Sequence, residues 1–316
     1  MSGNQPNTVA VIGGGTMGLG IAQVFRFAGS RVILCDADEP ASHTAKRDLA
    51  ARTERQVRAG LRPDTHLAAA ADVDVVFPAT AAVADADVVI EAVPEVMALK
   101  QDLLRDISHA TRPDAVIATN TSSYPIDQLA EQVRLPDRFL GWHWFAPPEW
   151  VPCVEVIRGP DTSGDVVTRS KDILTGVGKR PAEVANAPGF VANRLQMAMF
   201  AEAVRCVEEG VASPAEIDEI ISGSVGFRLP HYGPFAIADM AGLDTYVSVY
   251  ECLRDAYGDR FTPPQRLRDL VAEGRHGTKN GHGFADYTPD DQDRLLSERD
   301  ARYAAMNDFV RGLDRG

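Results

Sequence analysis

The stretch TVAVIGGGTMGLGIAQVFRFAG, residues 8–29, decides how the first half of the chain folds. A β-branched run at 8–12 leads directly into Gly13-x-Gly15-x-x-Gly18, and helix-forming sequence follows. In this context the three glycines predict a strand, a tight turn and a helix whose N-terminus attracts a pyrophosphate. A purely structural glycine turn is the alternative. We expect a dinucleotide to contact Gly13, Gly15, Thr16, Met17 and Gly18.

The next β-branched run, RVILC at 31–35, is followed at once by Asp36. A carboxylate at this place accepts hydrogen bonds from ribose hydroxyls and repels a 2′-phosphate. The sequence therefore predicts NAD rather than NADP as the cofactor. FAD could use the same glycine fingerprint, but the histidine chemistry described below fits a nicotinamide better.

Further short apolar runs alternate with helical sequence up to about residue 187. They lie at 86–92, 115–119, 138–143, 153–157 and 181–185. Runs without polar alternation are typical of strands that are covered on both faces. After NAPG at 186–189 the strand-like runs stop and apolar residues recur at helical spacing. The sequence thus predicts an α/β domain of Rossmann type with a mainly parallel sheet, 1–187, and an all-helical domain, 188–316.

Composition and charge narrow the class of protein. The net charge of −13 over 316 residues is unfavourable for binding nucleic acid. No apolar run approaches the roughly 20 residues that span a bilayer, and the polar start MSGNQPN lacks the basic region of a signal peptide. The four cysteines show no paired spacing, which predicts reduced thiols in a cytoplasmic protein. The histidines show no metal-ligand spacing, so we expect no metal.

The stretch GWHWFAPPEWVPCVEVIRG, residues 141–159, places His143 among aromatic residues, and Glu155 follows twelve residues later. Oxidation of an alcohol requires a general base near neutral pH, and histidine is the usual choice. If the two strand-like runs pair, Glu155 could hold one ring nitrogen and stabilise the imidazolium as it forms. A core histidine without chemistry is the alternative.

Seven motifs follow one another along almost the whole chain. They are VIGGGTMGLGIA, EAVPE (91–95), NTSS (120–123), GWHWFAPPEWVPCVEV, APGFVANRL (187–195), YGPFAIADMAGLD (232–244) and KNGHGF (279–284). In this order they resemble the 3-hydroxyacyl-CoA dehydrogenase superfamily. The resemblance implies an NAD-dependent enzyme that oxidises a C3 hydroxyl, with His143 as base and Glu155 as its partner. It also implies a homodimer built by the helical domain.

The same resemblance assigns three more polar residues. Ser122 would donate a hydrogen bond to the substrate hydroxyl or the nicotinamide, and Asn193 would bind the substrate's oxygen. Glu95 would line the cofactor. For Ser122 and Asn193, a role as ordinary capping residues is the alternative. Dehydrogenases of the 3-hydroxyisobutyrate type are excluded, because Gly189 rather than lysine stands four residues before Asn193.

Several departures from the acyl-CoA pattern bear on the substrate. This chain reads GFR, with Arg228, where acyl-CoA members typically read GFP or GYP, and a guanidinium there could clamp a free carboxylate. VPCVEV resembles relatives that act on free hydroxy acids, such as L-gulonate 3-dehydrogenase (λ-crystallin) and carnitine dehydrogenase. Ala146 replaces the family's usual asparagine. The tryptophans at 142, 144 and 150 could narrow the pocket instead.

An arginine stripe gives evidence for the other substrate class. Arg52, Arg55, Arg58 and Arg62 follow helical spacing and would share one helix face. The stripe could meet the phosphates of CoA, or it could be a solvated face on which Asp48 pairs with Arg52. We expect a small L-3-hydroxy acid as the substrate, with a 3-hydroxyacyl-CoA or carrier thioester as the alternative. A non-catalytic NAD-binding protein is the third reading.

Overall fold

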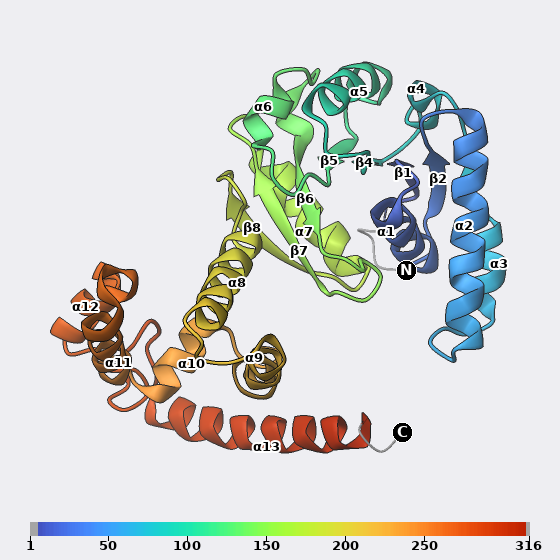
Figure 1. Cartoon of the computed structure of the whole chain (residues 1–316). Helices are drawn as coiled ribbons and strands as arrows, with labels where there is room; N and C mark the ends of the chain where they lie inside the picture. The colour runs from blue at the N-terminus through green and yellow to red at the C-terminus, as the bar shows by residue number, and fades with distance from the viewer. Residues whose placement is uncertain (1–5, 314–316) are drawn as a thin grey trace. The chain divides into compact units, whose positions relative to one another are not determined.

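An eight-stranded sheet forms the centre of the first of two units, Met1–Met199 (Figure 1). In the computed structural model, which describes residues 6–313, the strand order is β3-β2-β1-β4-β5-β6-β7-β8. The strands are β1 (Thr8–Ile12), β2 (Arg31–Cys35), β3 (Asp74–Val75), β4 (Val88–Glu91), β5 (Val116–Thr119), β6 (Phe139–Trp144), β7 (Cys153–Arg158) and β8 (Arg180–Ala185). Only β6 and β7 pair antiparallel. The predicted mainly parallel α/β sheet is confirmed.

Seven of these strands coincide with the apolar runs of the sequence. The exception is β3, which has two residues and lies in a segment rich in alanine. A strand this short carries no apolar run of its own, because it is defined only by its pairing with β2. It was therefore not predicted.

Helices cover both faces of the sheet. Core side chains of α1 (Thr16–Phe27), α2 (Glu39–Arg58), α3 (Thr65–Ala71) and α7 (Gly164–Gly176) pack on one face. Those of α4 (Ala79–Ala82), α5 (Met97–Ala110) and α6 (Ile126–Ala130) pack on the other. Successive strand residues alternate between these two cores, which explains why the runs show no polar alternation.

The second unit, Phe200–Gly316, is helical as predicted. Its helices are α9 (Pro214–Ile221), α10 (Pro234–Ala241), α11 (Leu243–Tyr257), α12 (Gln265–Ala272) and α13 (Pro289–Leu313). Ser213 caps α9 through a reciprocal pair of hydrogen bonds with Glu216, as its place before Pro214 predicts. A small core contains Ala238, Leu243, Leu267 and Leu270.

The division between the units falls inside α8 (Ala192–Glu208), at Met199/Phe200. The boundary expected at 187/188 stands before this helix and stays a prediction. Among residues 6–313, no helix combines the length and apolar character needed to cross a membrane.

Candidate active site

His143 and Glu155 lie directly opposite each other on β6 and β7. Opposite residues of an antiparallel pair point to the same face, with their Cβ atoms close together. The Nδ1 atom of His143 is 2.7 Å from Oε2 of Glu155. Both side chains are buried, with exposed fractions of 5% and 3%. The strand pairing on which the sequence argument depended is therefore present.

The unpaired nitrogen of His143 is placed for proton exchange. An ionised carboxylate only accepts hydrogen bonds, so Nδ1 carries the hydrogen and the lone pair of the neutral ring is on Nε2. Nε2 has no hydrogen-bond partner among the described residues. It is also not one of the fully buried polar atoms that lack a partner, so it keeps some exposure to solvent. The rings of Phe145 and Phe190 flank the imidazole, at 4.6 and 5.5 Å between centroids.

The second oxygen of Glu155 contacts the start of α8. Oε1 accepts hydrogen bonds from the backbone N–H groups of Val191 and Ala192, at 3.0 and 2.9 Å. Burial alone would raise the pKa of Glu155, but the hydrogen bonds from His143 and from these two backbone groups lower it below the ordinary value. The carboxylate is thus held in its charged form beside the imidazole.

Trp142 and Trp144 lie on the face of β6 opposite to His143. Their side chains are 0% and 2% exposed and pack against Phe25 of α1. This follows from the two-residue alternation of a strand. Trp150 is exposed and its ring stacks against the guanidinium of Arg62. The expectation that Trp142 and Trp144 narrow the space beside His143 is wrong.

Ser122 lies on a turn that Glu95 holds in place. Oε1 of Glu95 accepts from Thr121 Oγ1 at 2.5 Å, from the Ser122 and Ser123 N–H groups at 3.1 and 3.2 Å, and from Ser123 Oγ at 3.0 Å. Burial would raise the pKa of Glu95, but the hydrogen bond from Thr121 and the charge of Lys100 lower it. Asn193 donates from Nδ2 to the Ser122 carbonyl at 2.8 Å. The structure thus brings Glu95, Ser122 and Asn193 together.

A buried ion pair behind this turn was not predicted. The Nζ atom of Lys100 is 2.7 Å from Oε1 of Glu91 and 3.2 Å from Oε2 of Glu95, and Lys100 and Glu91 are 1% and 0% exposed. Thr119 also donates to Glu91. Glu91 at the carboxyl end of a predicted strand was a usable signal, because ligand sites of parallel sheets gather at that edge.

One more contact ties the Ser122 turn to the strand of His143. Asn120, the first residue of NTSS, accepts a hydrogen bond from the Trp144 N–H at 3.0 Å. Its own N–H donates to the Glu91 carbonyl. Glu155 bonds both to His143 and to the start of α8, where Asn193, the next residue, bonds to the Ser122 carbonyl.

The glycine loop has the geometry that a dinucleotide needs. Gly13 has φ +112°, and a Cβ there would lie 2.5 Å from the Ala92 carbonyl oxygen. A Cβ on Gly18 would collide with the Gly13 carbonyl, whereas one on Gly15 would meet no atom within 4 Å. Asp36 Oδ2 accepts from the Gly14 N–H at 3.1 Å. Open space over Gly15, a helix N-terminus and a carboxylate beside the loop fit NAD.

The arginine stripe differs from the expectation. α2 ends at Arg58, and Gly60 follows with φ +70°, so Arg62 is not on that helix. Arg52 pairs not with Asp48 but with the buried Glu149, at 2.5 Å, and its side chain is 16% exposed. The single helical face of four arginines is therefore wrong. Arg58 makes only an exposed pair with Glu54.

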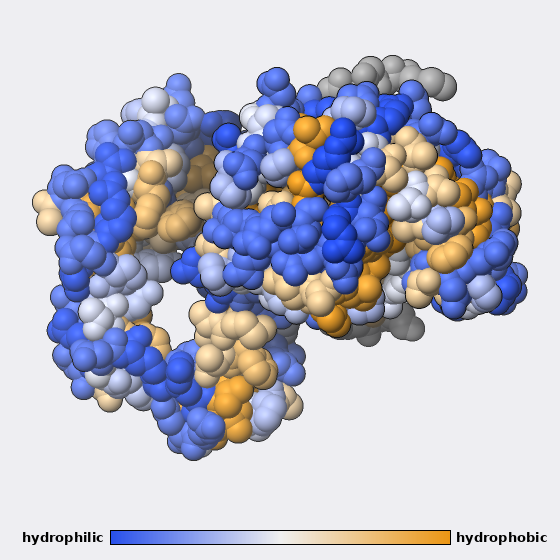
Figure 2. All heavy atoms as spheres, turned by 90° about the horizontal axis from the view of Figure 1, so that it is seen from above, coloured by the Kyte–Doolittle hydropathy of each residue, from blue (hydrophilic) through white to orange (hydrophobic). Residues whose placement is uncertain are grey.

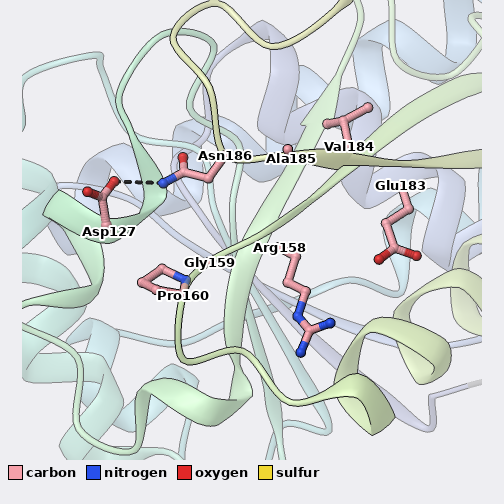
Figure 3. A pocket seen from close by; sticks show the side chains of 8 residues that line it. All are labelled: Asp127, Arg158, Gly159, Pro160, Glu183, Val184, Ala185 and Asn186. Atoms are coloured by element: carbon pink, nitrogen blue, oxygen red, sulfur yellow. Dashed lines mark hydrogen bonds between the residues drawn. The ribbon is translucent and has the colours of Figure 1, made fainter.

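A cavity that His143 does not line is found near the ends of β7 and β8. It has a volume of about 720 Å³, and its lining includes Arg158 and Glu183 (Figure 3). Beside it, Asn186 donates to Asp127 and accepts from the Ile126 N–H, which fastens the start of α6 to the chain after β8. Among residues 6–313, no group of three or more His, Cys, Asp or Glu could hold a metal ion. The absence of a metal stays a prediction.

Arg228 lies in the second unit, two residues beyond a π-helical turn at Ser222–Gly226. Its Nε donates to the Ser224 carbonyl at 3.2 Å. Its terminal nitrogens have no partner among the described residues. Arg228 lines a cavity of about 320 Å³ within that unit.

Two family models match the chain in succession. Residues 8–187 match the 3-hydroxyacyl-CoA dehydrogenase NAD binding domain, and residues 189–287 match the C-terminal domain of the same family. The chain belongs to the 3-hydroxyacyl-CoA dehydrogenase family. It is an NAD-dependent oxidoreductase that acts on a CH–OH group.

Three similar proteins illustrate the range within the family. The 5-formyl-3-hydroxy-2-methylpyridine 4-carboxylate 5-dehydrogenase of Mesorhizobium japonicum is 33% identical, over 97% of this chain and 99% of its own length. A probable 3-hydroxybutyryl-CoA dehydrogenase of Bacillus subtilis is 36% identical, over 88% and 96%. The solved 3-hydroxyacyl-CoA dehydrogenase of Archaeoglobus fulgidus is 28% identical, over 96% and 98%, with a TM-score of 0.78.

Proposed function

We propose that this dehydrogenase oxidises the C3 hydroxyl of a small L-3-hydroxy acid to the 3-oxo product. The observation that carries the reaction is the bond between His143 Nδ1 and Glu155, which leaves Nε2 unpaired. Nε2 takes the hydroxyl proton, and Glu155 stabilises the imidazolium that forms. When bound, the nicotinamide supplies the acceptor for the hydride that leaves C3.

Ser122 and Asn193 orient the oxygen of the substrate in this proposal. The hydroxyl of Ser122 makes no hydrogen bond to a described residue and is exposed, so it can donate to an incoming oxygen. Asn193 uses one of its two amide hydrogens on the Ser122 carbonyl and keeps the other. Glu95 holds the backbone of Ser122, and Asn193 is bonded to the Ser122 carbonyl, so Glu95 acts on the substrate through Ser122.

The cofactor contacts belong to the same proposal. Gly13, Gly15, Thr16, Met17 and Gly18 form the turn and first helical positions that receive the pyrophosphate, and Asp36 binds the ribose. The first intrahelical backbone bond runs from Leu19 to Gly15, so the N–H groups before Leu19 have no carbonyl partner within α1. Asp36→Ala should weaken NAD binding and relax discrimination against NADP. Unchanged ratios of kcat/KM for the two cofactors would contradict the ribose contact.

Two observations support a free acid rather than a CoA thioester. The terminal nitrogens of Arg228 are unpaired, and a guanidinium binds a carboxylate with two parallel hydrogen bonds. Arg52, by contrast, is already paired with a buried carboxylate, so it is not free to meet the phosphates of CoA. Arg228 is thus available for an anion, whereas Arg52, one of the four arginines of the expected stripe, is not.

The relatives support both substrate classes. The name of the M. japonicum relative describes a pyridine that carries a carboxylate, and that relative covers 97% of this chain. The B. subtilis relative, named for a hydroxybutyryl-CoA substrate, covers 88% of this chain. The A. fulgidus enzyme, however, covers 96% and is named for acyl-CoA. The share of this chain that a relative covers therefore does not separate free-acid from acyl-CoA enzymes, and a thioester is the alternative substrate.

The deciding experiment measures NADH formation with two substrate panels. One panel holds free 3-hydroxy acids and hydroxylated pyridine or aromatic acids, and the other holds L-3-hydroxyacyl-CoA thioesters. Arg228→Ala and the control Arg254→Ala, an exposed arginine on α11 of the same unit, are tested beside the wild type. We expect turnover of an acid that collapses only in Arg228→Ala. Turnover of thioesters alone, unaffected by Arg228→Ala, would overturn the free-acid assignment.

A cytoplasmic homodimer completes the proposal. Large apolar side chains of α8 and the second unit are exposed, and Figure 2 shows apolar residues in orange reaching the surface among polar ones in blue. They include Phe200, Val211, Ile220, Phe235 and Phe309, each at least 57% exposed. Isolated apolar residues are common on surfaces, but several large exposed ones within one helical unit support burial against a second copy. Light scattering of the purified chain tests this directly.

A further inference from the structure

A second arginine lines the same cavity as Arg228. The cavity of about 320 Å³ lies wholly within the second unit. Ile237, Met240 and Ala241 of α10 line it with apolar atoms, and Arg299 of α13 contributes the second guanidinium. α13 begins at Pro289, after the last residue that matches the C-terminal family model. The second arginine therefore comes from an element outside the matched domain.

α13 is positioned by packing against residues on both sides of Arg228 in the sequence. The ring of Tyr303, which also lines the cavity, lies 5.6 Å from that of Phe227 and 6.2 Å from that of Tyr232, between centroids. The guanidinium of Arg302 lies 5.3 Å over the ring of Tyr232. Aromatic and cation–π contacts of this kind stabilise the position of α13. Arg299 is therefore positioned by contacts to residues that flank Arg228.

The charges of the cavity favour an anion. Arg299 donates from Nε and one terminal nitrogen to Asp300, at 2.9 and 2.8 Å, and Asp300 is 71% exposed. An exposed ion pair of this kind has a small free energy, so Asp300 competes weakly for Arg299. Arg228 makes one bond, to a backbone carbonyl. Two guanidinium groups against one carboxylate leave an excess of one positive charge beside an apolar wall.

We propose that this cavity binds the carboxylate of a small organic acid whose frame is compact and apolar or aromatic. Arg228 is the first ligand of the carboxylate, Arg299 is the second, and the frame lies against Met240 and Tyr303. The identification of this acid with the substrate rests on the proposed function, whereas binding of the acid does not. The volume lies at the lower end of the range for small-molecule sites, which fits a small acid.

The test compares two probes of one shape that differ in charge. Binding of benzoate and of benzamide to the full chain is measured by calorimetry for the wild type, Arg299→Gln, Arg228→Gln and Arg294→Gln. Arg294 is the control, because it lies on the same helix but pairs with Asp291 and does not line the cavity. We expect benzoate to bind at least about tenfold more tightly than benzamide, and each of the two cavity variants to lose about tenfold or more. Arg294→Gln should not differ from the wild type.

Equal binding of the two probes, or benzoate affinity unchanged in Arg299→Gln, overturns the proposal. If Arg299→Gln unfolds, Arg299→Lys keeps the charge but not the two-pronged geometry. That variant should bind benzoate with an intermediate affinity, and wild-type affinity would again overturn the role of Arg299.

The outcomes also separate this inference from the proposed function. Arg299-dependent benzoate binding without turnover of any free hydroxy acid would refute the substrate assignment and leave the carboxylate site intact. Turnover of a free acid with an unchanged KM in Arg299→Gln, together with unchanged benzoate binding, would refute the site and leave the proposed function intact.

Discussion

Two buried carboxylates of the same sheet, Glu91 and Glu155, pair with different kinds of basic side chain. Glu91 on β4 accepts hydrogen bonds from Lys100, from the Val93 N–H and from Thr119, and Glu155 on β7 accepts from His143 and two backbone N–H groups. Both oxygens of each carboxylate accept hydrogen bonds. The difference lies in the partner, because the ammonium of Lys100 gives its contacts to Glu91, Glu95 and the Val93 carbonyl.

His143 differs from Lys100 in keeping one nitrogen unpaired. The unpaired nitrogen of the imidazole can accept a proton from an incoming hydroxyl, whereas the ammonium of Lys100 directs its contacts at Glu91, Glu95 and the Val93 carbonyl. A buried pair of this kind can support proton transfer only where one partner keeps an atom that can exchange a proton. Otherwise the pair only positions its neighbours.

The largest effect is expected from His143→Gln. Glutamine can keep a hydrogen bond to Glu155 but cannot accept a proton at Nε2, so kcat should fall by about 10²–10⁴-fold, the usual contribution of a general base. The thermal midpoint should change little, since Glu155 keeps its bonds to the start of α8. Steady-state kinetics with the acid found in the substrate panels measures this. Turnover within threefold of the wild type would exclude His143 as the base.

The Lys100→Met variant should act on stability instead. Removing one partner of a buried pair leaves Glu91 as an uncompensated charge, and the free energy of unfolding should fall by about 3–5 kcal/mol. Chemical denaturation of the purified variant gives this value. The double variant Glu91→Gln/Lys100→Met removes the stranded charge and should recover part of the loss. A single variant as stable as the wild type would show that the pair is not a structural element.

The two pairs also differ in how far the sequence predicts them. The apolar runs predict β6 and β7, so His143 and Glu155 could be placed together before the structure was known. Lys100 could not, because a lysine near the start of an amphipathic helix looks solvated, and only the fold turns its ammonium toward Glu91. Long-range partners such as these depend on sheet order and helix orientation, which no local pattern contains.

Two features that the sequence does contain, the orientation of the tryptophans and the end of α2, were predicted wrongly. The alternation Trp142–His143–Trp144 on a predicted strand places the tryptophans opposite the histidine, and the two-residue period was sufficient to show it. Gly60 was a signal that α2 ends before Arg62. The pairing of Arg52 with Glu149, in contrast, joins α2 to the β6–β7 connection and follows only from the tertiary structure.

A smaller effect is expected from Glu95→Gln. The amide keeps an oxygen that can accept from the Ser122 turn but loses the charge that strengthens those bonds and pairs with Lys100. We expect kcat to fall by about tenfold, with KM for NAD changed less, because Glu95 acts through Ser122. A Glu95→Ala variant should lose more. If both variants keep the wild-type kcat, the turn is held by other contacts and Glu95 has no positioning role.

The smallest effect is a slope in the dependence of stability on pH. The pKa of Glu155 is lowered in the folded state, so its ionised form stabilises the fold above the ordinary carboxyl pKa of about 4.3. As pH falls toward the folded pKa, the unfolded chain takes up this proton first and the stabilisation is lost. One group contributes at most about 1.4 kcal/mol per pH unit. Denaturant unfolding between pH 5 and about 3 should therefore show a shallower slope in Glu155→Gln than in the wild type.

The matched control for this slope is Glu54→Gln, which removes an exposed carboxylate paired only with Arg58 at the surface. The same measurement on Glu95→Gln extends the comparison, because the pKa of Glu95 is also lowered by the bonds of the Ser122 turn and by Lys100. Identical slopes in Glu155→Gln and the wild type would mean that the carboxylate is not held ionised by His143 and the start of α8. In that case the imidazolium would lack its stabilising charge, and the two buried pairs would differ less than their geometry indicates.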